Sequence, residues 1–168
     1  MKEIIYNYDY LNDSDINNTI SRAKMIVEND NEELLVVNSN NTYFLIGGHV
    51  EQDETFDECI IREIKEESGV EIPYEERKPF FSIKYYSKDY PEKGKNTKYI
   101  NNYYSIKFDL VPDYDKMKLE QNEINGNFKL SYIHKDNIID ILEENLKVSP
   151  KPVVVRDTIE VIKEYLKN

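Results

Sequence analysis

A helix with both ends marked lies between residues 55 and 69. Thr55 and Glu58 form a capping box, in which each side chain accepts a hydrogen bond from the other residue's backbone N–H. Gly69 supplies the left-handed residue that commonly ends a helix. The apolar residues between them recur every four positions: Phe56, Ile60 and Ile64. These signals predict a helix that starts at about Thr55, stops at Gly69 and buries this stripe.

The same helix carries three glutamates on one face, away from the apolar stripe. Glu63, Glu66 and Glu67 stand at i, i+3 and i+4, and each like-charged pair at such spacing costs an isolated helix roughly 0.2–0.5 kcal/mol. Taken alone, an acidic face of this kind is most simply a solvated surface. A bound cation is the alternative that would explain the cost.

Other segments indicate a sheet packed against helices. Alternating apolar and polar residues predict half-buried strands, continuous apolar runs predict central strands, and apolar residues at helical spacing predict two further helices. The alternating segments are 81–85, 104–110 and 128–132, the apolar runs are 34–37 and 43–46, and the helical segments are 138–142 and 155–166. This order favours an α+β fold, with a mixed β-sheet and helices on its faces.

Length and charge narrow the class of protein. A chain of 168 residues is expected to form a single domain, residues 1–168. The formal net charge of −11 disfavours nucleic acid as a partner. The N-terminal segment has no long apolar run, so we expect a soluble, cytoplasmic protein without a membrane span. The single cysteine, Cys59, excludes an intrachain disulfide and is expected to be a packing residue.

Residues 48–70 follow a longer pattern, G x5 E x7 R E U x E E x G U, in which U is a bulky aliphatic residue. Every fixed position is present: Gly48, Glu54, Arg62, Glu63, Ile64, Glu66, Glu67, Gly69 and Val70. This pattern is the Nudix box, and the sequence therefore resembles the Nudix hydrolases. The resemblance implies that family's αβα sandwich and hydrolysis of a diphosphate bond.

Hydrolysis of a diphosphate explains the acidic face. Water must reach a phosphorus atom surrounded by negative oxygens, so the reaction needs cations to neutralise charge. Mg²⁺ prefers oxygen ligands. The resemblance implies that Glu63, Glu66 and Glu67 bind Mg²⁺, with Mn²⁺ as the alternative, and that the carbonyl of Gly48 is a further ligand. A bound cation would remove the repulsion between the glutamates.

Two more residues of the pattern are expected to support catalysis. Arg62 would orient a carboxylate through a bidentate pair, and Glu54 would belong to the same network. His49 occupies a variable position of the pattern, and we expect no catalytic role for it.

The general base is not determined by the pattern. Glu63 is one candidate, and some Nudix hydrolases carry the base on a loop beyond the box. Here a loop precedes the expected strand at Phe128, and Gly126 would let it curl over the site. We favour Glu123 over Glu120 in that loop, although both would otherwise be ordinary solvated acids.

The segment after the box offers candidates for substrate binding. Lysines alternate with tyrosines between residues 84 and 104, so lysines would bind phosphates and tyrosines would stack on a base. Tyr86 and Lys95 are the candidates that we name. An exposed hairpin, with its turn marked by Pro91 and Gly94, is an equally good interpretation.

We therefore predict Mg²⁺-dependent hydrolysis of a nucleoside diphosphate linked to another group, such as a dinucleoside polyphosphate or a nucleotide sugar. The alternative is a catalytically weak Nudix domain that binds a nucleotide derivative as a sensor. The expected partner is this small molecule, and a homodimer remains open. The sequence does not determine the exact substrate, the phosphorus attacked or the number of metal ions.

Overall fold

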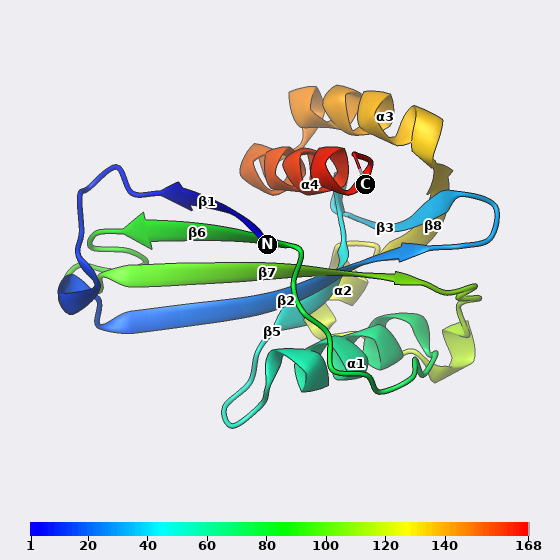
Figure 1. The fold of residues 1–168 in the computed structure, drawn as a ribbon, viewed down its shortest axis with the longest axis horizontal. Helices are drawn as coiled ribbons and strands as arrows, with labels where there is room; N and C mark the ends of the chain where they lie inside the picture. Colours follow the sequence, from blue (N-terminus) through cyan, green and yellow to red (C-terminus); the bar gives the residue numbers. More distant parts are fainter. Residues whose placement is uncertain (168) are drawn as a thin grey trace.

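The computed structural model describes residues 1–167 of the chain. In this part of the chain one mixed sheet of eight strands lies between helices (Figure 1). The strands are β1 (Lys2–Tyr6), β2 (Asn18–Glu28), β3 (Glu33–Ser39), β4 (Thr42–Phe44), β5 (Ile46–His49), β6 (Phe81–Ser87), β7 (Thr97–Lys107) and β8 (Lys129–His134). The helices are α1 (Phe56–Ser68), α2 (Gln121–Asn125), α3 (Lys135–Val148) and α4 (Pro152–Tyr165), with short 3₁₀ turns at Asp13–Asp15 and Tyr114–Lys116. The predicted α+β class with a mixed sheet is confirmed.

Strand β2 is central to the sheet. The strand order is β1-β6-β7-β2-β3-β4, while β5 also pairs with β2 and β8 with β3. Strands β2 and β7 run parallel over their whole length, and β1 and β6 are also parallel, whereas the other pairs are antiparallel. Arg22 of β2 thereby lies beside His49 of β5 on one side and Asn101 of β7 on the other.

Alternation along the strands divides the core into two layers, since successive side chains of a strand point to opposite faces. Ile26 and Phe81 pack with α3 and α4 on one face, and Met25 and Val27 pack with α1 on the other. Figure 1 shows α3 and α4 above the sheet and α1 below it, with β1, β6, β7 and β2 extending beyond these helices at one end. Helix, sheet and helix form the expected three layers.

Three predicted elements differ from the structure. The apolar run 43–46 is divided between β4 and β5, because the chain leaves β3 as its partner and joins β2 at Leu45. The helix expected around residues 138–142 is longer, since α3 extends from Lys135 to Val148. The loop expected before Phe128 contains helix α2, which begins directly after Glu120.

No helix of the described residues combines the length and apolar character that a membrane span requires.

Candidate active site

Helix α1 starts and stops where the sequence predicts. The Thr55 hydroxyl accepts from the backbone N–H of Glu58, and the Glu58 carboxylate accepts from the N–H of Thr55. Gly69 adopts the left-handed conformation with φ of 73°. Ile60 and Ile64 are buried against the sheet. This anchoring holds Glu63 and Glu67 of α1 beside the turn at Gly47 and Gly48.

Glu67 is not part of a solvated face. Its side chain is buried, with a relative exposure of 4% for the residue, and its carboxylate accepts a 2.9 Å hydrogen bond from the N–H of Gly47. Burial raises the pKa of Glu67 well above its ordinary value, while the Gly47 N–H and the charge of Lys24 act in the opposite direction. A buried carboxylate held in this way is costly unless it serves a partner, because burial disfavours its charged form.

Glu63 lies against the backbone of Gly48. A Cβ atom at position 48 would stand 2.2 Å from Oε1 of Glu63, so only glycine leaves room for this carboxylate. Burial raises the pKa of Glu63, and Arg62 opposes that shift. The predicted neighbours Gly48, Glu63 and Glu67 are thus brought together at one turn.

Arg62 links the remaining residues of the box. It forms a bidentate pair with Glu54, at 2.8 and 3.0 Å, which is the predicted kind of contact. One of its terminal nitrogens also donates to Glu63 at 2.9 Å and to Glu66 at 3.2 Å, and the other donates to the carbonyl of His49. Its hydrogen bond with Glu54 raises the pKa of Arg62 and lowers that of Glu54. Arg62 therefore fixes the positions of three carboxylates.

The oxygens of this cluster suit a hard divalent cation, since Mg²⁺ prefers carboxylate and carbonyl ligands. Gly48, Glu63, Glu66 and Glu67 would hold it. Among the described residues no three acidic, histidine or cysteine side chains are gathered closely enough to form a ready metal cluster. One nitrogen of Arg62 contacts one carboxylate oxygen of Glu63 and one of Glu66.

A cavity of about 780 Å³ opens beside the cluster. The glutamates of α1 form one rim, strands β2 and β7 form the floor, and α2 and α4 contribute walls. The charged and polar residues that line it include Arg22, Lys24, Glu63, Glu67, Asn101 and Glu123. The space suits a ligand of nucleotide size.

Glu120 and Glu123 both line this cavity. They belong to α2 and its cap rather than to a flexible loop, and Glu123 accepts a 2.6 Å hydrogen bond from the N–H of Glu120. Glu123 lines the same cavity as Glu63 and Glu67, and its negative charge contributes, after burial, to the raised pKa values of both. Gly126 has a φ of −79°, so its role is not backbone freedom; the side chain of Ser39 occupies the space where its Cβ would be.

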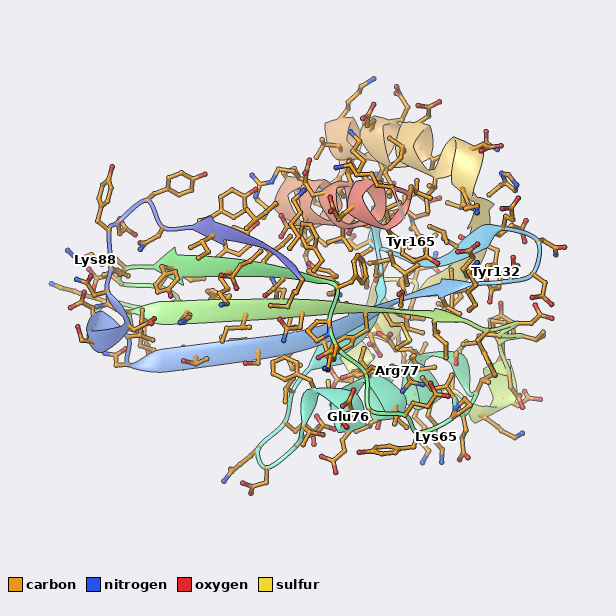
Figure 2. All side chains as sticks on the ribbon, in the orientation of Figure 1. Lys65, Glu76, Arg77, Lys88, Tyr132 and Tyr165 are labelled. Atoms are coloured by element: carbon orange, nitrogen blue, oxygen red, sulfur yellow. The ribbon has the colours of Figure 1, made fainter. Side chains whose placement is uncertain are left out.

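Tyr86 and Lys95 lie elsewhere. Neither is among the described residues that line the cavity. The Tyr86 hydroxyl donates to Asp13 at 2.9 Å, and Lys95 pairs with Glu92 at 2.7 Å. Figure 2 shows Lys88, from the same hairpin, at the end of the sheet opposite to α1. Strands β6 and β7 form a hairpin around this segment, and the structure does not bring these two residues to the box glutamates.

Sequence reasoning missed three residues of the cavity floor: Arg22, Lys24 and Asn101. Arg22 and Lys24 alternate with Ala23 and Met25 in a strand that continues as a buried apolar run. Two cations on one face of such a strand are a signal that could have been found.

Cys59 is buried as expected, and burial raises its pKa to about 12.

A mixed sheet between helical layers, with a glutamate-lined helix against a Gly-Gly turn, defines a pyrophosphohydrolase type of domain. The family model described as NUDIX domain matches residues 19–133. The chain belongs to the Nudix family, whose members generally use divalent metal ions.

Individual relatives are distant or partial. An ADP-ribose pyrophosphatase of Methanocaldococcus jannaschii is 47% identical over 49 residues, which cover 27% of this chain and 29% of that protein. The match therefore spans less than a third of this curated relative.

Solved structures share the fold. The MutT protein from Methanosarcina mazei Go1 has a TM-score of 0.52 at 18% identity, covering 90% of this chain and 97% of the other. The MutT NUDIX hydrolase from Burkholderia pseudomallei has a TM-score of 0.53 at 15% identity, covering 71% and 86%. At these identities the likeness concerns the fold alone.

Proposed function

We propose that this protein hydrolyses the diphosphate bond of a nucleoside diphosphate linked to another group, with Mg²⁺ or Mn²⁺ as cofactor. The observation that carries the proposal is that Gly48, Glu63, Glu66 and Glu67 all line one cavity of about 780 Å³, with Glu63 against Gly48 and Glu67 bonded to the N–H of Gly47. The partial match to an ADP-ribose pyrophosphatase supports this substrate class. The expected partner is a small molecule in the cytoplasm.

The residues of the site have different roles in this reaction, according to their positions. A divalent cation held by Gly48, Glu63, Glu66 and Glu67 would supply positive charge against the diphosphate and would acidify the attacking water. Arg62, which pairs with Glu54, donates directly to the carboxylates of Glu63 and Glu66 and so holds them in place. Water adds to one phosphorus and its proton passes to a carboxylate. The bond between that phosphorus and the bridging oxygen breaks, and the second phosphate leaves with the bridging oxygen.

We propose Glu123 as the carboxylate that accepts this proton. One of its oxygens is occupied by the N–H of Glu120, and among the described residues no donor contacts the other. Glu63 also has one oxygen engaged, but its donor is the charged guanidinium of Arg62, at 2.9 Å, which makes that carboxylate a weaker proton acceptor.

The proposal is tested by a product screen with the purified protein. Nucleotides, nucleotide sugars, ADP-ribose and dinucleoside polyphosphates are incubated with Mg²⁺ or Mn²⁺, and the products are identified by chromatography. Turnover that depends on the metal supports the proposal. Nucleotide binding without turnover of any compound would contradict it and favour the sensor.

Glutamine variants at positions 63, 120 and 123 distinguish the general base from a metal ligand. We expect Glu123→Gln to lower kcat by roughly 10²- to 10⁴-fold with nearly unchanged metal affinity, because a general base contributes about this much. Glutamine keeps the capping position of residue 123, so α2 is preserved. Glu63→Gln is expected to lose metal affinity as well, and Glu120→Gln is the matched control on the same helix. Calorimetry measures metal binding and steady-state kinetics measures kcat.

One outcome would contradict this assignment. If Glu123→Gln has normal turnover, and Glu63→Gln still binds metal but is inactive, then the general base is Glu63 on α1.

A further inference from the structure

Two cations lie on the cavity floor. Arg22 and Lys24 point to the same face of β2 and line the cavity. The charges of Glu67 and Glu63 act on Lys24, whereas Arg22 has no carboxylate partner among the residues that the structure describes. The Arg22 guanidinium lies 5.6 Å from the ring centre of Tyr99, and Nζ of Lys24 donates to the carbonyl of Leu45 at 3.2 Å. Burial lowers the pKa of both groups. Partly buried cations of this kind usually have an anionic partner.

Asn101 adds an independent observation. It is the residue of β7 opposite Arg22, its relative exposure is 8%, and it also lines the cavity. Its Oδ1 atom is buried and has no hydrogen-bond partner among the described residues. A buried polar atom without a partner is rare in a folded protein, so this position is a candidate for a ligand contact. Rotation of the amide lets Asn101 present either its NH₂ or its oxygen.

The register of the sheet orders these groups along the cavity. Lys24 lies beside Gly47, whose N–H binds Glu67, whereas Arg22 lies beside His49, two residues further along β2. Two residues of a strand span roughly 6.6 Å. An anionic chain that begins at the glutamates and Lys24 therefore meets Arg22 and Asn101 next.

We propose that Arg22 and Asn101 bind a further phosphoryl group of the substrate, so that the protein prefers chains of three or more phosphates, as in nucleoside triphosphates and dinucleoside polyphosphates. A diphosphate joined to a neutral sugar leaves this position without an anion. The inference rests on the proposed function, because it places the hydrolysed diphosphate at the glutamates of α1. A guanidinium is suited to this role because it stays charged and binds phosphate oxygens through two N–H groups.

The test compares two substrates in one series of variants. Diadenosine tetraphosphate carries the additional phosphates and ADP-ribose does not. We expect Arg22→Gln to lower kcat/KM for the tetraphosphate roughly tenfold or more, as for a lost hydrogen bond to a charged group, and to change kcat/KM for ADP-ribose less than about twofold. Asn101→Asp should have the same selective effect because it places a negative charge beside Arg22. Arg22→Lys should restore part of the loss.

Arg156→Gln is the matched control. Arg156 also lies over a tyrosine ring, with its guanidinium 4.9 Å from the centre of Tyr6, but it is outside the cavity lining. The ratio of the two kcat/KM values should stay unchanged in this variant. If Arg156→Gln changes this ratio as much as Arg22→Gln does, the assignment of Arg22 is wrong. The assignment is also wrong if Arg22→Gln lowers kcat/KM equally for both substrates, because Arg22 would then be a packing residue against Tyr99.

A binding measurement separates this inference from the proposed function. Calorimetry with inorganic tripolyphosphate and inorganic pyrophosphate in excess Mg²⁺ needs no turnover. The wild type should bind tripolyphosphate more tightly, and Arg22→Gln should remove most of that difference. If the wild type hydrolyses no compound but keeps this preference, the proposed function fails and the phosphate site stands. If the wild type shows no preference, the phosphate site fails even when hydrolysis is observed.

Discussion

Glu67→Gln is expected to lower kcat by roughly three orders of magnitude or more, because loss of a metal ligand removes several kcal/mol of stabilisation of the transition state. Glutamine keeps the size of the side chain, and its amide oxygen can still accept the hydrogen bond from Gly47. The change therefore removes charge with little loss of packing. Steady-state kinetics at saturating substrate and metal measures kcat.

The stability of Glu67→Gln should not fall together with its kcat. In the absence of metal, the free energy of unfolding of Glu67→Gln should be equal to or slightly higher than that of the wild type, because the variant no longer buries a carboxylate. Mg²⁺ at about 100 times its Kd should stabilise the wild type by about 2.7 kcal/mol, and the variant much less. Chemical denaturation with and without Mg²⁺ measures both effects.

Glu58→Gln provides the control for both measurements. It makes the same chemical change on the same helix, and glutamine also serves in a capping box. Its turnover and its stabilisation by Mg²⁺ should match those of the wild type. A Glu67→Gln variant with full turnover would show that Glu67 is a structural residue.

Gly47→Ala is expected to lower the free energy of unfolding by about 3–5 kcal/mol. Gly47 has a φ of +124°, where L side chains are strained, and an added Cβ would lie 2.2 Å from the carbonyl oxygen of Ala23 and 2.9 Å from Cα of Lys24. Both contacts are with the backbone of the central strand β2, which cannot move without disturbing its pairing with β7. Urea denaturation measures the effect.

Gly94→Ala distinguishes the backbone strain of a positive φ from the steric clash of an added Cβ atom. Gly94 also has a positive φ, of +88°, but nothing lies within 4 Å of its added Cβ. Only the conformational cost remains there, about 1–2 kcal/mol. If the two alanine variants are equally destabilised, the close approach of Gly47 to β2 is not what requires glycine.

The local structure around the site was predictable because its signals act over one or two helical turns. The capping box at Thr55 and the glycine at position 69 determine where α1 begins and ends, and both are confirmed. The apolar stripe determines which face of α1 is buried. The spacing of the box therefore placed the glutamates correctly on one helix face before any tertiary contact was known.

Burial of the individual glutamates was decided by tertiary structure. The three share one helix face, yet Glu67 is buried and Glu66 is partly exposed. The difference arises because the turn at Gly47 packs against the C-terminal half of α1, and that turn is set by its pairing with β2. Helical periodicity distinguishes faces of a helix, but not which part of a face another segment covers.

The cavity floor and the hairpin show the same limit over longer distances. Arg22 and Asn101 become neighbours only because β2 and β7 pair in parallel in one register, and no local pattern encodes that register. Tyr86 has the residue type expected of a substrate contact, but its strand directs it to Asp13, away from the cavity. Short-range hydrogen bonds and apolar periodicity thus determined α1 and its glutamates from the sequence alone, whereas strand pairing decided which charges meet the substrate cavity.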